Sequence, residues 1–546
     1  MAAQTATLFI ALFILFSYIT QRGRKKVSYG VNKLPGPGRA PWLIGHMPVL
    51  MRPEQSGDAD FLWTRLFGYA VHIKGPFGRD VLFISDPKVI QHVLNTPRYK
   101  FPKSPDTRFR IRLVAGKGIA WADGEQHTRQ RKVMNPAFSP SAIRDFLPII
   151  QDTSRIAVSK WQDIIAQGLE NATVLDVYGW LSRLTLDSLG GALDYDFEAL
   201  TGNSHNELTK AYKNLLSAAH YKPSNFSIAF REICGYLPEW MIGVLQSIPS
   251  KKTKLLMEYT EAAENVSRKL VDRQLESIAA GQPGGRDIMS LLVKANQSQD
   301  LNGKVAYSEL VAQLTTLLVA GHETLANTIG WTLYELSKRP EIQRQLRSEI
   351  SAVRLVAAQS GCHELASIDY DSMTLLSAVI KETLRFHPAL PLTSRIASED
   401  DVLPLWVPTT TNSGKIINKI PVQKGQRITI SFAAYHRLTS LWGDDAEIWN
   451  PSRFLNPIEP SSGDKISMGM FSNLLTFSSG ERSCIGWRFA MLSIHVILFE
   501  LLEKFEFSPP PGNVKVFRAA AGVITPMIKD GSSVRVELPL TVTSVA

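Results

Sequence analysis

The longest run of hydrophobic positions extends from Ser308 to Arg339 and reads SELVAQLTTLLVAGHETLANTIGWTLYELSKR. Apolar residues occupy nearly every face that a helix would present here, which is typical of a helix buried at the centre of a large domain. Ser308 is a suitable N-cap, and Glu309 falls in the first turn. Pro340 would end this helix and open the next one. The pattern therefore predicts one long central helix.

Strand-like patterns are few. VHIKG and DVLFIS, within residues 71–85, could form a hairpin about the turn 76–78, and GQRITISF at 425–432 alternates as a strand does. Helical patterns dominate the rest of the chain. We therefore expect an α+β fold that is mainly α-helical with small β-sheets.

A polar interruption, AGHET at 320–324, lies in the middle of the central helix. Glycine costs about 1 kcal/mol relative to alanine within a helix, and a buried glutamate is unfavourable unless it is paired or meets water. Two interpretations stay open at this point. The segment is either a polar patch on a partly exposed turn, or a kink that lines a cavity, with Glu323 and Thr324 facing something polar.

A second apolar helix, predicted at 485–504, follows the stretch FSSGERSCIGWRF. Cys484 stands there between Gly480 and Gly486, so we expect backbone N–H groups and the helix dipole to lower the pKa of its thiol. Arg482 adds positive charge. Such a thiolate could be a nucleophile, a redox sensor or a metal ligand, and a structural cysteine at a loop–helix junction is the simplest alternative. A lone thiolate as the only protein ligand of a metal would suggest haem, which supplies four nitrogens itself.

The first apolar segment, residues 2–21, carries no charge and is followed by RGRKK at 22–26. A membrane-spanning helix needs roughly 17–25 apolar residues. The cations follow the apolar run, and they fill the expected cleavage site, which favours an uncleaved anchor over a signal peptide. We predict a transmembrane anchor at 2–21, a basic and proline-rich linker at 22–41, and a catalytic domain at 42–546 on the cytosolic side.

Composition narrows the classes of function. The 546 residues are 44% hydrophobic, enough for a large core, and 60 Lys+Arg against 50 Asp+Glu give a formal charge of +10. Because this excess is spread along the chain, it indicates an ordinary basic surface, and no nucleic-acid partner is expected. The cysteines at 234, 362 and 484 are far apart. Their spacing argues against a disulfide framework and a four-ligand zinc site.

The spacing Phe477-x-x-Gly480-x-Arg482-x-Cys484-x-Gly486 resembles the haem-binding loop of the cytochrome P-450 superfamily, in the style of its fungal microsomal members. Three further motifs stand in the order of that family. They are KETLRFHP with Glu382 and Arg385, WNPSRF with Arg453, and AGHET. The resemblance implies the cytochrome P-450 fold, with a long central helix over haem b.

The resemblance also implies a role for each motif residue. Cys484 would be the proximal iron ligand, in a loop formed with Phe477, Gly480 and Gly486. Glu382, Arg385 and Arg453 would form a buried structural triad. Thr324 would hydrogen-bond bound oxygen or a water, and Glu323 would relay protons from solvent. The candidate cations for the two haem propionates are His127, Arg131, Arg395 and Arg482. His127 stands where the family has tryptophan.

Electrons would come from NADPH through a membrane-bound flavoprotein reductase, and the protein would lie in the endoplasmic reticulum membrane with a single span. Arg129, Lys132 and Arg144 could form a basic docking face, although a solvated helix face explains them nearly as well. Segments 105–120 and 205–250 would border the substrate pocket, with the aromatic residues Tyr221, Phe226, Phe230 and Trp240. They carry no charged recognition motif, which favours a lipophilic substrate.

The expected function is therefore an O₂-dependent monooxygenase acting in secondary metabolism or on xenobiotics. Two alternatives remain. One is a haem-thiolate isomerase, dehydratase or peroxygenase, which the Glu323–Thr324 pair argues against. The other is a haem-binding protein without turnover.

Overall fold

The structure is a computed structural model. It describes residues 30–167, 171–202, 220–238, 241, 251–281, 285–300, 303–361, 364–456, 468–510, 512, 514–531 and 533–545. The predicted anchor at 2–21 and the first part of the predicted linker lie outside these residues. Within the described ranges, no helix has both the length and the apolar character that crossing a membrane requires.

Helices form most of the molecule. The longer ones are α3 (Asp58–Phe67), α4 (Pro87–Asn95), α5 (Pro105–Ala115), α6 (Gly124–Met134), α8 (Leu147–Ala166), α9 (Val177–Ala192), α12 (Asn225–Cys234), α14 (Lys251–Ala279), α15 (Ile288–Gln297), α16 (Tyr307–Gly321), α17 (Glu323–Ser337), α18 (Pro340–Gln359), α20 (Thr374–Phe386) and α24 (Trp487–Lys504). The shorter ones are α2 (Met47–Met51), α7 (Pro140–Asp145), α19 (Ser367–Ser372), α21 (Phe432–Tyr435), α22 (Thr439–Trp442) and α23 (Ser452–Leu455). Short 3₁₀ helices are η1 (Val31–Lys33), η2 (Pro76–Gly78), η3 (Asn135–Phe138) and η4 (Gly480–Arg482).

The strands form small separate sheets. They are β1 (Ala70–Lys74), β2 (Asp80–Ile84), β3 (Ala172–Asp176), β4 (Leu392–Ile396), β5 (Asp401–Thr410), β6 (Ile416–Val422), β7 (Arg427–Ser431), β8 (Phe505–Ser508), β9 (Val516–Ala521), β10 (Val523–Asp530), β11 (Ser533–Val536) and β12 (Pro539–Ser544). The sheet orders are β1-β2-β7-β4, β11-β10-β9, β3-β12-β8 and β5-β6. The expected α+β class, mainly helical with small sheets, is confirmed.

The predicted hairpin and strand are both present. β1 and β2 pair antiparallel across η2, with Val71 opposite Phe83. β7 joins β2 in parallel, with Leu82 opposite Ile428. Sequence patterns did not reveal β5, β6 or β9, whose burial is mixed and does not alternate cleanly.

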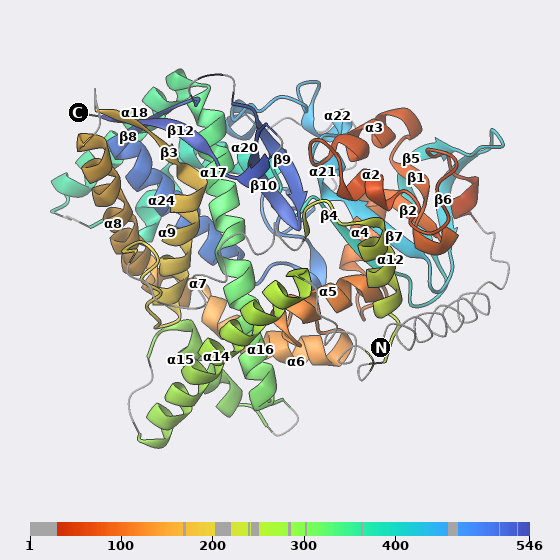
Figure 1. Ribbon diagram of the computed structural model, residues 1–546, viewed down its shortest axis with the longest axis horizontal. Helices are drawn as coiled ribbons and strands as arrows, with labels where there is room; N and C mark the ends of the chain where they lie inside the picture. The colour runs from red at the N-terminus through yellow and green to blue at the C-terminus, as the bar shows by residue number, and fades with distance from the viewer. Residues whose placement is uncertain are drawn as a thin grey trace.

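The predicted single central helix is wrong in one respect. It is divided at His322 into α16 and α17, which together cross the middle of the molecule (Figure 1). Its N-cap is Ala306, whose N–H donates to the Glu309 carboxylate at 2.9 Å, so Ser308 is not the cap. Pro340 opens α18 as predicted.

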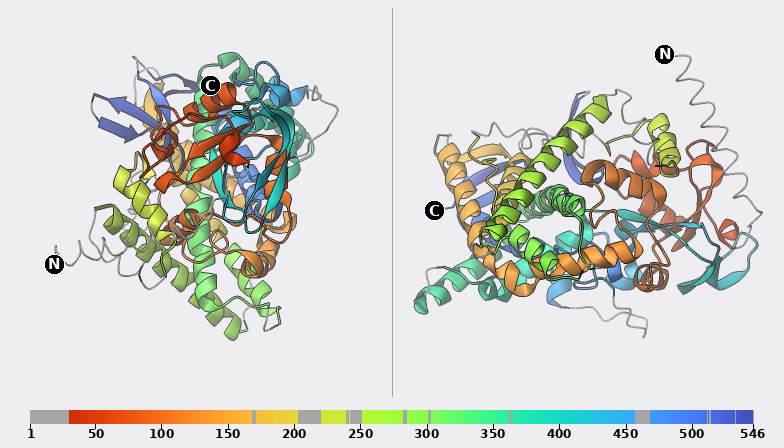
Figure 2. Two further views of the ribbon diagram at one scale, coloured as in Figure 1. Left: turned by 90° about the vertical axis from the view of Figure 1, so that its right-hand side faces the viewer. Right: turned by 90° about the horizontal axis from the view of Figure 1, so that it is seen from below.

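One group of helices lies on one side of α16 and α17, and the largest sheet lies on the other. α8, α9, α18 and α24 lie on the helical side, whereas β1, β2, β4 and β7 lie opposite with α2 and α3 (Figure 1). The view from below keeps these two sides apart as well (Figure 2, right). α17 contacts α9, α20 and α24, so the apolar core surrounds it.

A buried ion pair on α20 links this helix to the segment 436–453, which follows β7. Glu382 and Arg385 have no exposed surface, and two hydrogen bonds of 2.7 Å join their side chains. Arg385 also donates to the carbonyls of His436 and Ala446. Arg453 approaches Glu382 at 3.6 Å, so the structure brings the three predicted triad residues together.

Substituting Glu382 by alanine is predicted to destabilise the fold severely. The change would leave the buried Arg385 guanidinium uncompensated, at a cost of roughly 3–5 kcal/mol. Denaturant unfolding of both proteins measures the difference. Glu264→Ala is the matched control, since Glu264 pairs with Arg268 at 3.6 Å on an exposed helix face, where such pairs contribute about 0–1 kcal/mol. Equal losses in the two variants would contradict the prediction.

Candidate active site

Cys484 lies in a tight loop that leads into α24. The Cys484 N–H donates to the Phe477 carbonyl at 2.8 Å, and the Ser483 N–H donates to the Gly480 carbonyl at 3.0 Å. α24 begins at Trp487, just after the N-cap residue Gly486. The backbone therefore turns back on itself immediately before the helix, as the glycine spacing predicts.

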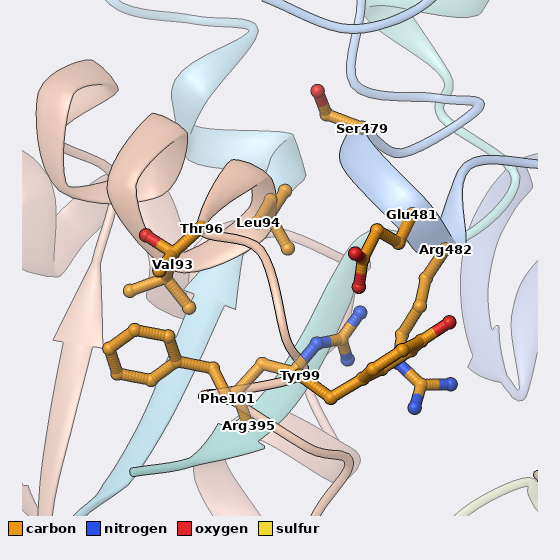
Figure 3. Close-up of a pocket in the computed structure, with 9 residues that line it drawn as sticks. All are labelled: Val93, Leu94, Thr96, Tyr99, Phe101, Arg395, Ser479, Glu481 and Arg482. Atoms are coloured by element: carbon orange, nitrogen blue, oxygen red, sulfur yellow. The ribbon is translucent and has the colours of Figure 1, made fainter. Parts of the chain in front are cut away.

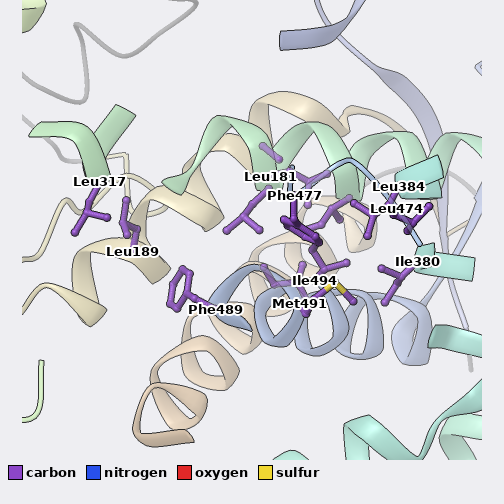
Figure 4. Close-up of a cluster of buried hydrophobic side chains, with 14 of the residues drawn as sticks. Leu181, Leu189, Leu317, Ile380, Leu384, Leu474, Phe477, Phe489, Met491 and Ile494 are labelled. Atoms are coloured by element: carbon purple, nitrogen blue, oxygen red, sulfur yellow. The ribbon is translucent and has the colours of Figure 1, made fainter. Parts of the chain in front are cut away.

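Two hydrogen bonds fix the segment before this loop. One joins it to α20, and the other joins it to His436, whose carbonyl accepts from Arg385. The Leu475 N–H donates to His436 Nε2 at 2.9 Å, and Thr476 Oγ1 donates to the Leu384 carbonyl at 2.7 Å. Leu474 and Phe477 pack among apolar side chains of α20 and α24 (Figure 4). The buried Glu382–Arg385 pair thus reaches the cysteine loop through His436.

Cys484 is an exposed residue, although other residues lie densely around its thiol. Burial raises the pKa of the Cys484 thiol, while a hydrogen bond from the Gly486 N–H and the charge of Arg131 act in the opposite direction. The expected net lowering of this pKa is wrong for the protein alone, because desolvation outweighs the backbone. The cation that acts on the thiol is Arg131, not Arg482.

Arg131 and His127 lie one turn apart on α6. Arg131 donates to the Ser483 carbonyl at 2.7 Å and to Ser483 Oγ at 3.2 Å, so it braces the residue before the cysteine. His127 is 2% exposed and its Nδ1 lies 2.7 Å from the Tyr99 hydroxyl. Burial, together with the charges of Lys103 and Arg131, lowers the pKa of His127 to about 4.

Further cations converge beside them. Arg395 on β4 is 4% exposed, and it donates only to Thr393 Oγ1 and the Ser394 carbonyl within the described part of the chain. Lys103 lies opposite it in a β-bridge. Burial, with the charges of Arg482, Arg395 and Arg108, holds the pKa of Lys103 well below its usual range. Arg395 and Arg482 line one pocket with Tyr99 (Figure 3).

Two carboxylates offset part of this charge. Asp123 pairs with Arg482, and also with Arg108 at 3.3 Å. Glu481 lines the same pocket as Arg395 and Arg482. Lys103, Arg131 and Arg395 form no ion pair within the described residues, so the site keeps an excess of positive charge.

These residues fit the haem that the sequence resemblance implies. A partly accessible thiol inside the protein can serve as the single protein ligand of its iron. The surplus of buried and half-buried cations suits its two propionates, because a desolvated charge is unfavourable until it is paired. Cys484, Arg131 and Arg395 would hold the group. The predicted roles of Phe477, Gly480, Gly486 and Arg482 remain predictions.

The division between α16 and α17 supplies a polar site on the central helix. Thr185 Oγ1 of α9 donates to the His322 carbonyl at 3.1 Å, and Thr324 Oγ1 donates to the Ala320 carbonyl at 2.8 Å. Ala320 is exposed and Thr324 partly so, although both lie on the central helix. Glu323 is buried at 5% exposure. The helix is thus interrupted at AGHET, as the second interpretation requires, whereas a cavity faced by Glu323 and Thr324 stays a prediction.

One of the three cations predicted for the docking face is already paired within the protein. Arg129 donates to both Glu309 oxygens, at 2.8 and 3.0 Å, so it joins α6 to α16 and is not a free docking cation. Lys132 and Arg144 are exposed. Trp240 lies outside the described residues. The sequence analysis missed Tyr99 and Lys103, because nothing in PRYKFPKSP indicates the long-range contacts that bring them to the site.

Comparisons with known proteins agree with this geometry. The sequence model of the cytochrome P450 family matches residues 35–528. Cytochrome P450 monooxygenase 91 of Postia placenta is 32% identical over 93% of both chains. Cytochrome P450 monooxygenase claO of Ampulloclitocybe clavipes is 31% identical over 92% of both. Ganoderic acid synthetase of Ganoderma lucidum is 30% identical over 87% of this chain and 88% of its own.

The two loop glycines are predicted to respond differently to alanine. Gly480 has φ +67°, and a Cβ there would lie 2.1 Å from the Leu94 carbonyl oxygen, so Gly480→Ala should destabilise the fold. The left-handed backbone alone costs roughly 1–2 kcal/mol. Gly486 has φ −87°, and its Cβ would meet only the Phe138 ring at 3.7 Å. Gly486→Ala is therefore the control. Thermal unfolding checks both, and equal shifts would contradict the prediction.

Proposed function

The chain belongs to the cytochrome P450 family, and we propose that it inserts one oxygen atom of O₂ into a lipophilic small molecule at the membrane of the endoplasmic reticulum. It is an oxidoreductase, a haem-thiolate monooxygenase. The observation that carries the proposal is the Cys484 thiol, accessible in its glycine-bracketed loop before α24 and acted on by the Arg131 guanidinium.

Haem, when bound, supplies the iron that takes up O₂ and the oxidising power for attack on a C–H bond. The chain's own residues set the conditions for that chemistry. Cys484 would bind as the thiolate, since coordination removes the proton that burial otherwise retains. The Gly486 N–H and the Arg131 guanidinium would moderate the charge of the sulfur. Lys103 and Arg395 would fix the orientation of the group by pairing with its carboxylates.

Thr324 and Glu323 would transfer protons during the reaction. Thr324 uses its hydroxyl hydrogen on the Ala320 carbonyl, so its oxygen is left to accept a hydrogen bond from a water. That water would deliver protons, and the Glu323 carboxyl would replenish them. The partial exposure of Thr324 and Ala320 supports this arrangement.

The substrate class is inferred from the elements around α16. A Cβ on Gly118, just after α5, would lie 2.3 Å from Thr316 Oγ1, so this loop presses directly on the central helix. α12 covers α5, and Phe109 and Cys234 pack together with apolar neighbours. Apolar walls favour a lipophilic substrate. Because one relative is named for ganoderic acid, we favour secondary metabolism over xenobiotic oxidation.

The proposal also names a source of electrons and a membrane anchor. NADPH would donate through a membrane-bound flavoprotein reductase, with the exposed Lys132 and Arg144 on its docking face. The apolar residues 2–21, with cations at 22–26 behind them, support a single-pass anchor with the catalytic domain in the cytosol.

Reconstituted turnover tests the proposal. Holoprotein combined with a microsomal NADPH-dependent reductase should oxidise NADPH and consume O₂ only when both reductase and O₂ are present, and Cys484→Ala should abolish this activity. Substrate conversion without O₂, or with hydrogen peroxide and no reductase, would instead indicate an isomerase, dehydratase or peroxygenase. NADPH consumption that responds to no lipophilic ligand would indicate a haem-binding protein without turnover.

Thr324→Ala is predicted to uncouple electron use from product formation. NADPH oxidation should continue, while hydrogen peroxide release rises and product per NADPH falls about tenfold or more, because positioned proton delivery contributes roughly 10²–10⁴-fold to such steps. Thr332→Ala is the matched control, since Thr332 makes the same bond to a carbonyl one turn back, Thr328 O at 2.8 Å, but is fully buried. Unchanged coupling in Thr324→Ala would contradict the role.

A further inference from the structure

A surface hollow of about 390 Å³ lies where the first described residues meet α12. Residues between Arg39 and Arg52 form most of its lining, and Asn225 of α12 completes it. A hollow of this volume can take a small ligand or the polar end of a larger one. Among the described residues that line it, two are arginines and none is acidic. The lining is therefore suited to an anion.

Arg52 is held in place and yet has no ionic partner. Its Nε donates to the Pro223 carbonyl at 2.6 Å, and one Nη donates to Asn225 Oδ1 at 2.8 Å. These bonds use two of the five N–H groups of the guanidinium. Within the described part of the chain, Arg52 forms no ion pair. A guanidinium fixed in this way loses little freedom when it binds an anion with its remaining N–H groups.

The loop that forms the rest of the hollow is fixed to β1. The His46 N–H donates to the Lys74 carbonyl at 2.7 Å, and the Lys74 N–H donates to His46 Nδ1 at 2.9 Å. Gly45 has φ +59°, and a Cβ there would lie 2.1 Å from the Lys74 carbonyl oxygen, so only glycine permits this close approach. The hollow is thus a product of the fold. Arg39 precedes the fixed part and is exposed, and its side chain forms no ion pair with any described residue.

Exposed apolar side chains accompany these two cations. Trp42, Leu43 and Val49 are exposed, although each is a large hydrophobic residue. Phe226, which follows Asn225 at the start of α12, is 65% exposed. Exposed apolar residues beside cations mark a site of interaction, and tryptophan next to arginine is typical of the boundary between water and lipid.

An anionic phospholipid suits both the charge and the apolar side chains. Its phosphate would pair with the arginines, while the upper part of its acyl chains would meet the exposed apolar residues. The hollow is also close in sequence to the predicted anchor at 2–21, since the cations at 22–26 and residues 27–38 alone separate it from Arg39. Cations at this place in a chain are attracted to anionic headgroups. Free phosphate would leave the apolar side chains in water.

We propose that the hollow between Arg39 and Arg52 binds the phosphate of an anionic phospholipid at the membrane surface. Arg52 supplies hydrogen-bond donors in a fixed position, and Arg39 adds a second positive charge. The inference rests on the membrane attachment in the proposed function. It does not depend on the haem chemistry.

Lipid retention tests the site. Full-length holoprotein is reconstituted in nanodiscs of phosphatidylcholine that contain a small share of phosphatidylserine, and the lipids that stay bound after release are identified by native mass spectrometry. Wild-type protein should retain one phosphatidylserine in preference to phosphatidylcholine. Arg52→Gln and Arg39→Gln should each lower this preference about tenfold, as expected for the loss of a hydrogen bond to an ionised group.

The controls separate the site from general charge and from the fold. Arg344→Gln removes the same charge from an exposed position on α18 and should leave the preference unchanged. If Arg52→Gln disturbs the contact with α12, Arg39→Gln still tests the site, because the Arg39 side chain bonds to no described residue. Inorganic phosphate in excess should not displace the lipid. The haem spectrum of each variant should match that of wild type.

Each other result overturns the inference in a recognisable way. Equal retention of the two lipids, or unchanged retention in both Arg39→Gln and Arg52→Gln, would show that the hollow holds no lipid phosphate. An equal loss in Arg344→Gln would show an effect of net charge only, and displacement by inorganic phosphate would show a site for free phosphate. In these cases the proposed function stands. If wild-type protein does not enter nanodiscs of phosphatidylcholine alone, the membrane attachment in the proposed function fails, and the inference fails with it.

Discussion

The placement of the cysteine loop depends on one buried ion pair, Glu382 with Arg385. Both side chains are fully buried, so each charge is tolerable only because the other is present. Arg385 holds the His436 carbonyl, and His436 Nε2 in turn accepts the Leu475 N–H. Two residues later the Phe477 carbonyl accepts the Cys484 N–H. The buried pair is thus connected by hydrogen bonds to the loop that carries the candidate iron ligand.

Positive charge is the second constraint on the site. Arg395 is buried and Lys103 and Arg131 are half-buried, none has an ion pair among the described residues, and desolvation lowers the pKa of each. A protein that buries cations in this way needs an anion to complete it. This need links the fold to haem, and the neighbouring His127, whose pKa burial lowers to about 4, adds no further positive charge.

Local sequence predicted the features that depend on neighbouring residues. The turn at 76–78, the Glu382–Arg385 spacing and the start of α24 all follow from positions a few residues apart. The motif order also identified the family. The sequence could not reveal the interruption at His322 as two separate helices, since Thr185 of α9 helps to hold it from a distance of 137 residues in the chain. The engagement of Arg129 with Glu309, the desolvation of Cys484 and the approach of Tyr99 to His127 are likewise long-range contacts.

The ferrous–CO difference spectrum of the purified holoprotein tests the central claim, that Cys484 is the thiolate ligand of haem iron, most directly. The account predicts a strongly red-shifted band in wild-type protein and its loss in Cys484→Ala. Wild-type protein without that band, or a Cys484→Ala variant that retains it, would contradict the account.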